Sequence, residues 1–323
     1  MATARRTGTN ESITTYGSGQ TYTLLATWES DTDNNNSGTT TSPVLECLAA
    51  QYDDVVNMGG STNDATYFRI IRPQTGNFHS GKRDTGVQFY STADSNAFNF
   101  AETNSQWQDL VIKTTQNSAT GRSAWADSAG AGTNFTIGCI FPASSNAGSG
   151  NDSGVINNQA GAVIGFIDCL AENCEQHQFF ANVTGTYFYN CTAIQVAAAA
   201  FGFDGAAGVI AKNCLATAGS GSSFSASWSA SSTNNSSADT TAPGSNPRTS
   251  QTFTFVNSGA NDYHLASNDA GALGFGADLS GDGTFAFDDD IDRTTISGTW
   301  NIGMDWFATA TITVKQLAAL GVG

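Results

Sequence analysis

Short runs of apolar residues alternate with Gly, Ser, Asn and Ala along this chain, and they recur at a regular spacing. Four cysteines, each inside such a run, are separated by 30, 22 and 23 residues: Cys139, Cys169, Cys191 and Cys214. A second set of runs repeats at 24, 22 and 23 residues, taking as equivalents Val155, Phe179, Phe201 and Phe224. Two strand patterns with one period of about 22–24 residues indicate a stacked solenoid.

The repeating unit lacks a helical pattern and holds short strands separated by small polar residues, so one coil of a parallel β-helix fits it. The four cysteines are then predicted to form one inward column, because free cysteine is a small and usually buried side chain. The residues before them are expected at a bend where Asn adopts left-handed backbone, namely Gly138, Asp168, Asn190 and Asn213. The alternative is a metal or redox site, which the presence of three histidines in the whole chain disfavours.

Five segments follow from the pattern. Residues 1–45 are expected to form an N-terminal arm and cap, with Leu24, Leu25 and Trp28 at the spacing of a short helix. The predicted organisation continues with β-helix coils at 46–228, a polar loop or linker at 229–251, C-terminal coils and a closing segment at 252–307, and a tail at 308–323. The tail is expected to pack on its own coil end or on a partner subunit.

Composition narrows the classes of partner. The chain has 323 residues and a formal charge of −16, which disfavours nucleic acid and anionic membranes. No apolar run reaches the roughly 20 residues of a membrane helix, so no membrane insertion is expected. The first residues lack the apolar stretch of a signal peptide, and the six cysteines lack a CxxC pair. Cytoplasmic synthesis with reduced thiols is therefore expected.

The C-terminal stretch carries the most specific motifs: "DYHL", "GFGADLS", "DDIDRTT" and "TWNIGMDWF" within residues 261–307. They resemble the closing segment of right-handed parallel β-helix (pectate-lyase-like solenoid) proteins of phage and environmental origin, whose pattern is like "DIDG…R…WDIGADEF". The chain departs from it at Arg293, where Gly is usual, and at Asn301, where Asp is usual. The resemblance implies an all-β, right-handed parallel β-helix and no particular reaction.

Several polar clusters are candidates for chemistry. One lies at residues 171–177 and offers acid–base groups: Glu172, Cys174, Glu175 and His177. A second, at 278–292, contains Asp278, Asp282, Asp288, Asp289, Asp290 and Asp292, for which a structural calcium ion is the alternative to a plain acidic cap. A basic loop at 76–86 holds His79, Lys82 and Arg83. Three tryptophans, Trp107, Trp125 and Trp228, are candidates for stacking on sugars, and the strand pattern places Trp107 and Trp125 equally well in the core.

Three functions compete. The favoured one is a non-enzymatic virion protein (a phage spike, fibre or capsid-decorating subunit), homotrimeric, located in the virion among other virion proteins and able to adsorb to a host-surface glycan. It has no catalytic, cofactor or metal residues. The first alternative is a β-helix polysaccharide lyase or hydrolase, or a tailspike depolymerase. The coils offer few basic residues, Lys113, Arg122 and Lys212, which disfavours a lyase. A hydrolase pair such as Asp168 with Asp204 stays open, although the two lie on different strand ladders and are not expected to face each other. The second alternative is a secreted adhesin or sugar-binding module.

Overall fold

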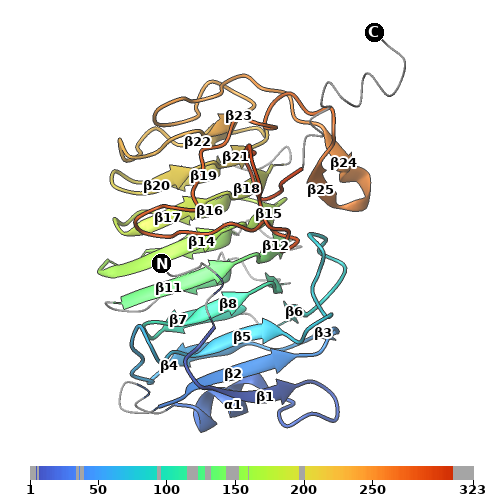
Figure 1. Ribbon diagram of the computed structural model, residues 1–323, viewed down its shortest axis with the longest axis vertical. Coiled ribbons are helices and arrows are strands. Elements are labelled where there is room, and N and C mark those ends of the chain that lie inside the picture. Colours follow the sequence, from blue (N-terminus) through green and yellow to red (C-terminus); the bar gives the residue numbers. More distant parts are fainter. Residues whose placement is uncertain are drawn as a thin grey trace.

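The computed structural model is a parallel β-solenoid whose coils stack along its longest axis (Figure 1), so the predicted all-β parallel β-helix is confirmed. It describes residues 5, 7–33, 36, 40–92, 96–114, 123–127, 132–142, 153–158, 160–195 and 201–307. Arg122 and the tail at 308–323 lie outside these residues. Within the described part, no helix has the length and apolar character that a membrane span needs.

Three parallel sheets form the walls of the solenoid. Sheet A contains β1 (Glu11–Tyr16), β2 (Ser42–Cys47), β5 (Ile70–Pro73), β8 (Gln106–Gln108), β11 (Gly132–Ile137), β14 (Ala162–Ile167), β17 (Thr186–Tyr189) and β20 (Ile210–Lys212). Sheet B contains β4 (Val56–Gly59), β7 (Phe98–Ala101), β10 (Ser123–Asp127), β13 (Ser153–Asn157), β16 (His177–Ala181), β19 (Phe201–Gly205) and β22 (Ser222–Phe224). Sheet C contains β3 (Gln51–Tyr52), β6 (Gln88–Ser91), β9 (Val111–Thr114), β12 (Ile140–Pro142), β15 (Leu170–Glu172), β18 (Thr192–Ile194), β21 (Leu215–Ala216) and β23 (Ser236–Ser237).

The four regularly spaced cysteines, Cys139, Cys169, Cys191 and Cys214, form one inward column, as predicted. All four of its members are free and buried in the main hydrophobic core. The bend residues before them have positive φ angles of 60° at Gly138, 51° at Asp168, 51° at Asn190 and 53° at Asn213. Asn and Asp tolerate this left-handed backbone better than other side chains do. The opening pattern of the sequence therefore marks the turn between sheet A and sheet C.

The second repeated set, predicted as Val155, Phe179, Phe201 and Phe224, also forms an inward column, with one residue assigned two positions too early. Val155, Phe179, Phe203 and Phe224 pair in register, and the rings of Phe179 and Phe203 stack with centroids 4.8 Å apart. Phe201 was predicted in this column, and that assignment was wrong. Phe203, two residues later, takes the core position, and the Phe201 ring is left partly exposed.

The predicted N-terminal helix is α1 (Leu25–Asp31), which buries Leu25 and Trp28 against the first coils. Residues 229–251, expected as a polar loop or linker, instead pack as a further coil. Within them β23 pairs in parallel with β21, and Asn235 Nδ2 donates to the Ala211 carbonyl at 2.9 Å. This polar coil is therefore held to the preceding one by hydrogen bonds, whereas the other coils are stabilised mainly by burial of apolar side chains.

The closing segment runs back along the outside of the coils (Figure 1). It begins with β24 (Phe255–Asn257), the short 3-10 helix η2 (Ser258–Ala260) and β25 (Asp262–Leu265). Phe285 and Trp300 pack on the outer side of sheet A, while Tyr263, Ile291 and Met304 pack on sheet C. Sheet B carries the pocket described next.

Candidate functional site

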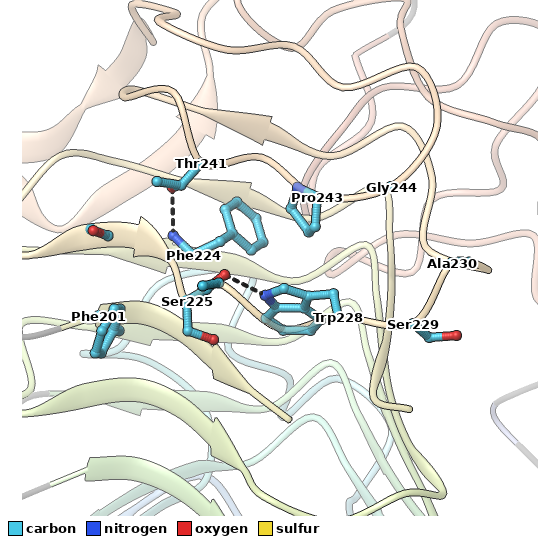
Figure 2. Close-up of a pocket in the computed structure, with 11 residues that line it drawn as sticks. Phe201, Phe224, Ser225, Trp228, Ser229, Ala230, Thr241, Pro243 and Gly244 are labelled. Atoms are coloured by element: carbon cyan, nitrogen blue, oxygen red, sulfur yellow. Dashed lines mark hydrogen bonds between the residues drawn. The ribbon is translucent and has the colours of Figure 1, made fainter. Parts of the chain in front are cut away.

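A pocket of about 600 Å³ opens at the end of sheet B, between the last two strands of that sheet and the coil that follows. Figure 2 shows Phe224, Trp228 and Pro243 close together, with Phe201 on the preceding strand. The remaining side chains of the lining are small or carry hydroxyl groups, namely Ser222, Ser225, Ala226, Ser229, Ala230, Thr241 and Gly244. Aromatic surface ringed by hydroxyls is typical of a pocket for a small, partly apolar ligand.

Trp228 is fixed in place by its neighbours. Its Nε1 donates a hydrogen bond to the Ser225 carbonyl at 3.0 Å, and its ring lies edge-on to that of Phe224 at 5.8 Å. Gly205 makes room for the indole, because a Cβ there would lie 2.7 Å from the ring. Of the three tryptophans that are candidates for sugar stacking, Trp228 is half-buried at the pocket, whereas Trp107 and Trp125 are in the core.

A histidine and a carboxylate lie beside the pocket on the same outer face. His177 pairs in register with Phe201, which in turn pairs with Ser222 of the pocket. The imidazole stacks on the Phe201 ring at 5.8 Å with an interplanar angle of 5°. Its Nδ1 lies 3.5 Å from Asp204 Oδ2. Strands β16 and β19 thus join two residues that are 27 positions apart in sequence.

The electrostatics of His177 suit a proton acceptor. Burial lowers its pKa, against the opposing effect of Asp204, so the imidazole is neutral near pH 7. A carboxylate facing Nδ1 favours the tautomer that carries the proton there, which leaves Nε2 as the acceptor. A neutral histidine oriented by a carboxylate can take a proton from water or from a sugar hydroxyl.

The other members of the 171–177 cluster separate in space. Glu172 ends β15 on the outer face of sheet C, Cys174 is buried, and Glu175 lies in the turn before β16. The Asp168–Asp204 pair does not form, since Asp168 is buried at a bend between sheets A and C while Asp204 is on sheet B. Sequence proximity therefore grouped His177 with the wrong carboxylates, and the coil register gives it Asp204.

The three basic side chains of the loop at 76–86 also have separate partners. His79 is buried, accepts from Gly81 N–H at Nδ1 and donates through Nε2 to the Gly138 carbonyl at 2.6 Å. Lys82 pairs with Asp262 at 2.8 Å, and Arg83 reaches Glu172. The loop fastens the closing segment and sheet C together.

The acidic stretch at 278–292 is tied to the solenoid by individual contacts. Asp282 pairs with Lys212 at 2.5 Å, Asp289 pairs with Arg5, and Asp290 accepts backbone N–H groups, including that of Thr294 at 2.8 Å. Arg293, where Gly is usual, adopts a φ of 63° and contacts Asp109. Calcium binding in this stretch stays a prediction.

Among the described residues, His264, Asp292 and Asp305 bring ligand atoms within 4.8 Å of one another, close enough that the three could hold a metal ion. Both ring nitrogens of His264 already face carboxylates: Nδ1 lies 2.5 Å from Asp262 and Nε2 lies 3.1 Å from Asp292. Burial opposes the charge of this imidazole, but Asp292, Asp305 and Asp262 outweigh it and raise its pKa to about 9. These contacts fit a protonated histidine that holds β25 to the closing segment.

The fold and this face define a parallel β-helix with an aromatic pocket and an adjoining histidine–carboxylate pair. No protein-family model matches the chain, and no curated protein matches it. Two crystal structures of the pectin methylesterase from Aspergillus niger are similar to it in fold, with TM-scores of 0.44 and 0.43 and 12% sequence identity in both. The matches cover 85% and 86% of this chain and 94% of the other.

At this identity the likeness concerns the fold. Both solved chains are of an enzyme, which contradicts the expectation of a non-enzymatic protein, but a likeness of this size carries no activity over to this chain. The expected virion role finds no support in these comparisons.

Proposed function

We propose that this chain is a carbohydrate-active enzyme that binds a polysaccharide along the outer face of sheet B. The observation that carries the proposal is the continuity of the Trp228 pocket, the Phe201 ring and the His177–Asp204 pair on one face. A sugar ring has an apolar face and a rim of hydroxyls, which an aromatic side chain surrounded by Ser and Thr matches. The acidic surface of the chain favours neutral or esterified polymers over polyanions.

The reaction that this pair fits is ester hydrolysis. Glycoside hydrolysis uses two carboxyl groups on either side of the scissile bond, whereas this face presents a neutral imidazole oriented by one carboxylate. His177 Nε2 takes a proton from water, and the resulting hydroxide attacks the carbonyl carbon of an ester on the sugar chain. The C–O bond to the alcohol breaks, and the alcohol leaves with the proton that His177 returns.

Asp204 is expected to act as a positioning residue. With Nδ1 facing its carboxylate, the ring is held in one orientation and the imidazolium that forms is stabilised. Trp228 and Phe201 contribute binding of the sugar chain. Loss of one aromatic contact of this kind costs about 1 kcal/mol, or about a fivefold change in affinity.

The test incubates the purified chain with soluble polysaccharides that are unmodified, acetylated or methyl-esterified. Released acid, new reducing ends and new unsaturated ends distinguish ester hydrolysis, glycoside hydrolysis and elimination. We expect acid release that His177→Gln lowers by about 100-fold or more, and a raised KM with little change in kcat for Trp228→Ala.

Asn99→Ala is the matched control. Asn99 lies on the same sheet, paired with Asn57 at 2.7 Å and distant from the pocket, so its activity should equal that of the unmodified chain. The proposal fails if no polymer is bound or cleaved, or if His177→Gln remains as active as the control.

A further inference from the structure

A second polar cluster lies on the outer face of sheet C, away from the pocket. Strand register places Tyr90 next to Lys113 and Pro142 next to Glu172, while β9 and β12 pair through Val111 and Ile140. The neighbouring positions on these strands, such as Phe89 and Ile112, point into the core. Tyr90, Lys113 and Glu172 therefore occupy one outward row that crosses the sheet.

Two other elements complete the cluster. Arg83, from the loop before β6, places Nη1 at 3.4 Å from Glu172 Oε1, and its carbonyl accepts a hydrogen bond from the Tyr90 hydroxyl at 3.3 Å. Tyr263 of β25 packs on sheet C beside the same carboxyl, and neither oxygen of Glu172 has a hydrogen-bond partner among the described residues. The Lys113 ammonium lies over the Tyr90 ring, 5.4 Å from its centroid.

The charges of this cluster are unevenly exposed. The side chain of Glu172 is 0% exposed, whereas Arg83 is 26% exposed and Asp84 is 67% exposed. Lys113 is partly exposed. Arg83 thus pairs with a fully buried carboxyl, Lys113 lies on the same outward row, and the other acidic neighbour, Asp84, is largely solvated.

We propose that Arg83 and Lys113, with the Tyr263 hydroxyl, form a binding site for one oxyanion, a carboxylate or a group of similar shape, for which Glu172 is the resident competitor. Arginine and tyrosine donate hydrogen bonds in the geometry that a carboxylate accepts. An anion enters from the exposed side of the two cations when Glu172 gives up its negative charge. This site goes beyond the proposed function and does not depend on it.

Titration of Glu172 sets the pH dependence of anion affinity at this site. Burial raises the pKa of this carboxyl to about 7, against the opposing effect of Arg83, and burial together with Arg83 lowers the pKa of Lys113. The charged or titratable groups that face the cluster are Arg83 and Asp84 from the loop, Tyr90 from β6, Lys113 from β9, Cys174 from the turn after β15 and Tyr263 from β25. Protonation of Glu172 leaves both cations without their buried counter-ion, so anion affinity should rise as the pH falls through 7.

Isothermal titration calorimetry tests this with sodium acetate, sodium sulfate, a monomeric uronate and a uronate trimer, with a neutral trisaccharide as control. For the unmodified chain we expect about tenfold weaker anion binding at pH 8 than at pH 6, since protonated Glu172 falls about tenfold over that interval. In Glu172→Gln the binding at pH 8 should equal that at pH 6. Histidines are unchanged in that variant, so a pH dependence that survives it would overturn the assignment to Glu172.

Lys113→Met should reduce anion affinity at least tenfold, whereas Lys82→Met, which removes a neighbouring lysine paired with Asp262, should leave it unchanged. A circular dichroism melt checks that each variant is folded. Trimer binding stronger than monomer binding identifies an acidic sugar chain as the source of the anion, and equal binding identifies a free small anion. Absence of binding by all four anions at pH 6, or equal loss in both lysine variants, would refute the site.

Discussion

Arg69→Met is the change with the clearest expected cost, because Arg69 joins the N-terminal helix to the solenoid. Its guanidinium is 0% exposed and pairs with the equally buried Glu102. It also donates to the Glu29 carbonyl at 3.0 Å and to Thr32 Oγ1 at 3.2 Å, and it lies over the Trp28 ring at 5.8 Å. The C-terminal half of α1 and the residue that follows β7 therefore meet at one side chain.

Removing one partner of a buried ion pair leaves the other charge unpaired away from water, which costs about 3–5 kcal/mol. Methionine keeps most of the volume of Arg69, so the loss reflects charge rather than a cavity. Replacing both partners, as in Arg69→Met with Glu102→Leu, should cost less than the sum of the single changes, because the fully buried charge of Glu102 is removed with its partner and the remaining partner, Glu29, is partly exposed.

Urea unfolding gives the global free energy, and hydrogen exchange of the α1 amides reports the local effect. Exchange is needed because a long stacked array does not always unfold in one step. We expect α1 to lose protection first in Arg69→Met and to regain part of it in the double variant. A single variant within 1 kcal/mol of the unmodified chain, or strictly additive changes, would contradict this account of the cap.

Two further predictions concern the coil turns and the closing segment. Asn190→Ala should lower the free energy of unfolding by about 1–2 kcal/mol, because its φ of 51° is strained for alanine, while Asn190→Gly, which imitates Gly138 of another coil, should be nearly neutral in the same urea titration. His264 has a folded-state pKa of about 9, above its ordinary 6.5, so its stabilisation is complete below about pH 6.5 and is lost as the pH rises through 9. Thermal melts from pH 6 to 10 should show this decline in the unmodified chain and a flatter profile in His264→Ala. An equally steep decline in the variant would assign it to other groups.

The sequence by itself determined the class of fold. The cysteine ladder, the Asn and Asp residues before it and the small polar residues between strands predicted an all-β parallel solenoid, and the observed register and φ angles agree. The helix around Trp28 was also readable, because its apolar spacing is local. These features depend on near neighbours in the chain or on a strict period, both of which sequence displays.

Only the tertiary structure decided which residues meet. His177 acquires Asp204 from the next coil, and Glu172 acquires Arg83 and Tyr263 from a loop and a hairpin that lie far away in sequence. The core position of Phe203 was also missed, since alternation alone does not show which of Phe201 and Phe203, two residues apart on one strand, pairs with Phe179 in the core column. Such pairings depend on how the coils stack and on where the closing segment packs. The sequence alone therefore did not predict the candidate site.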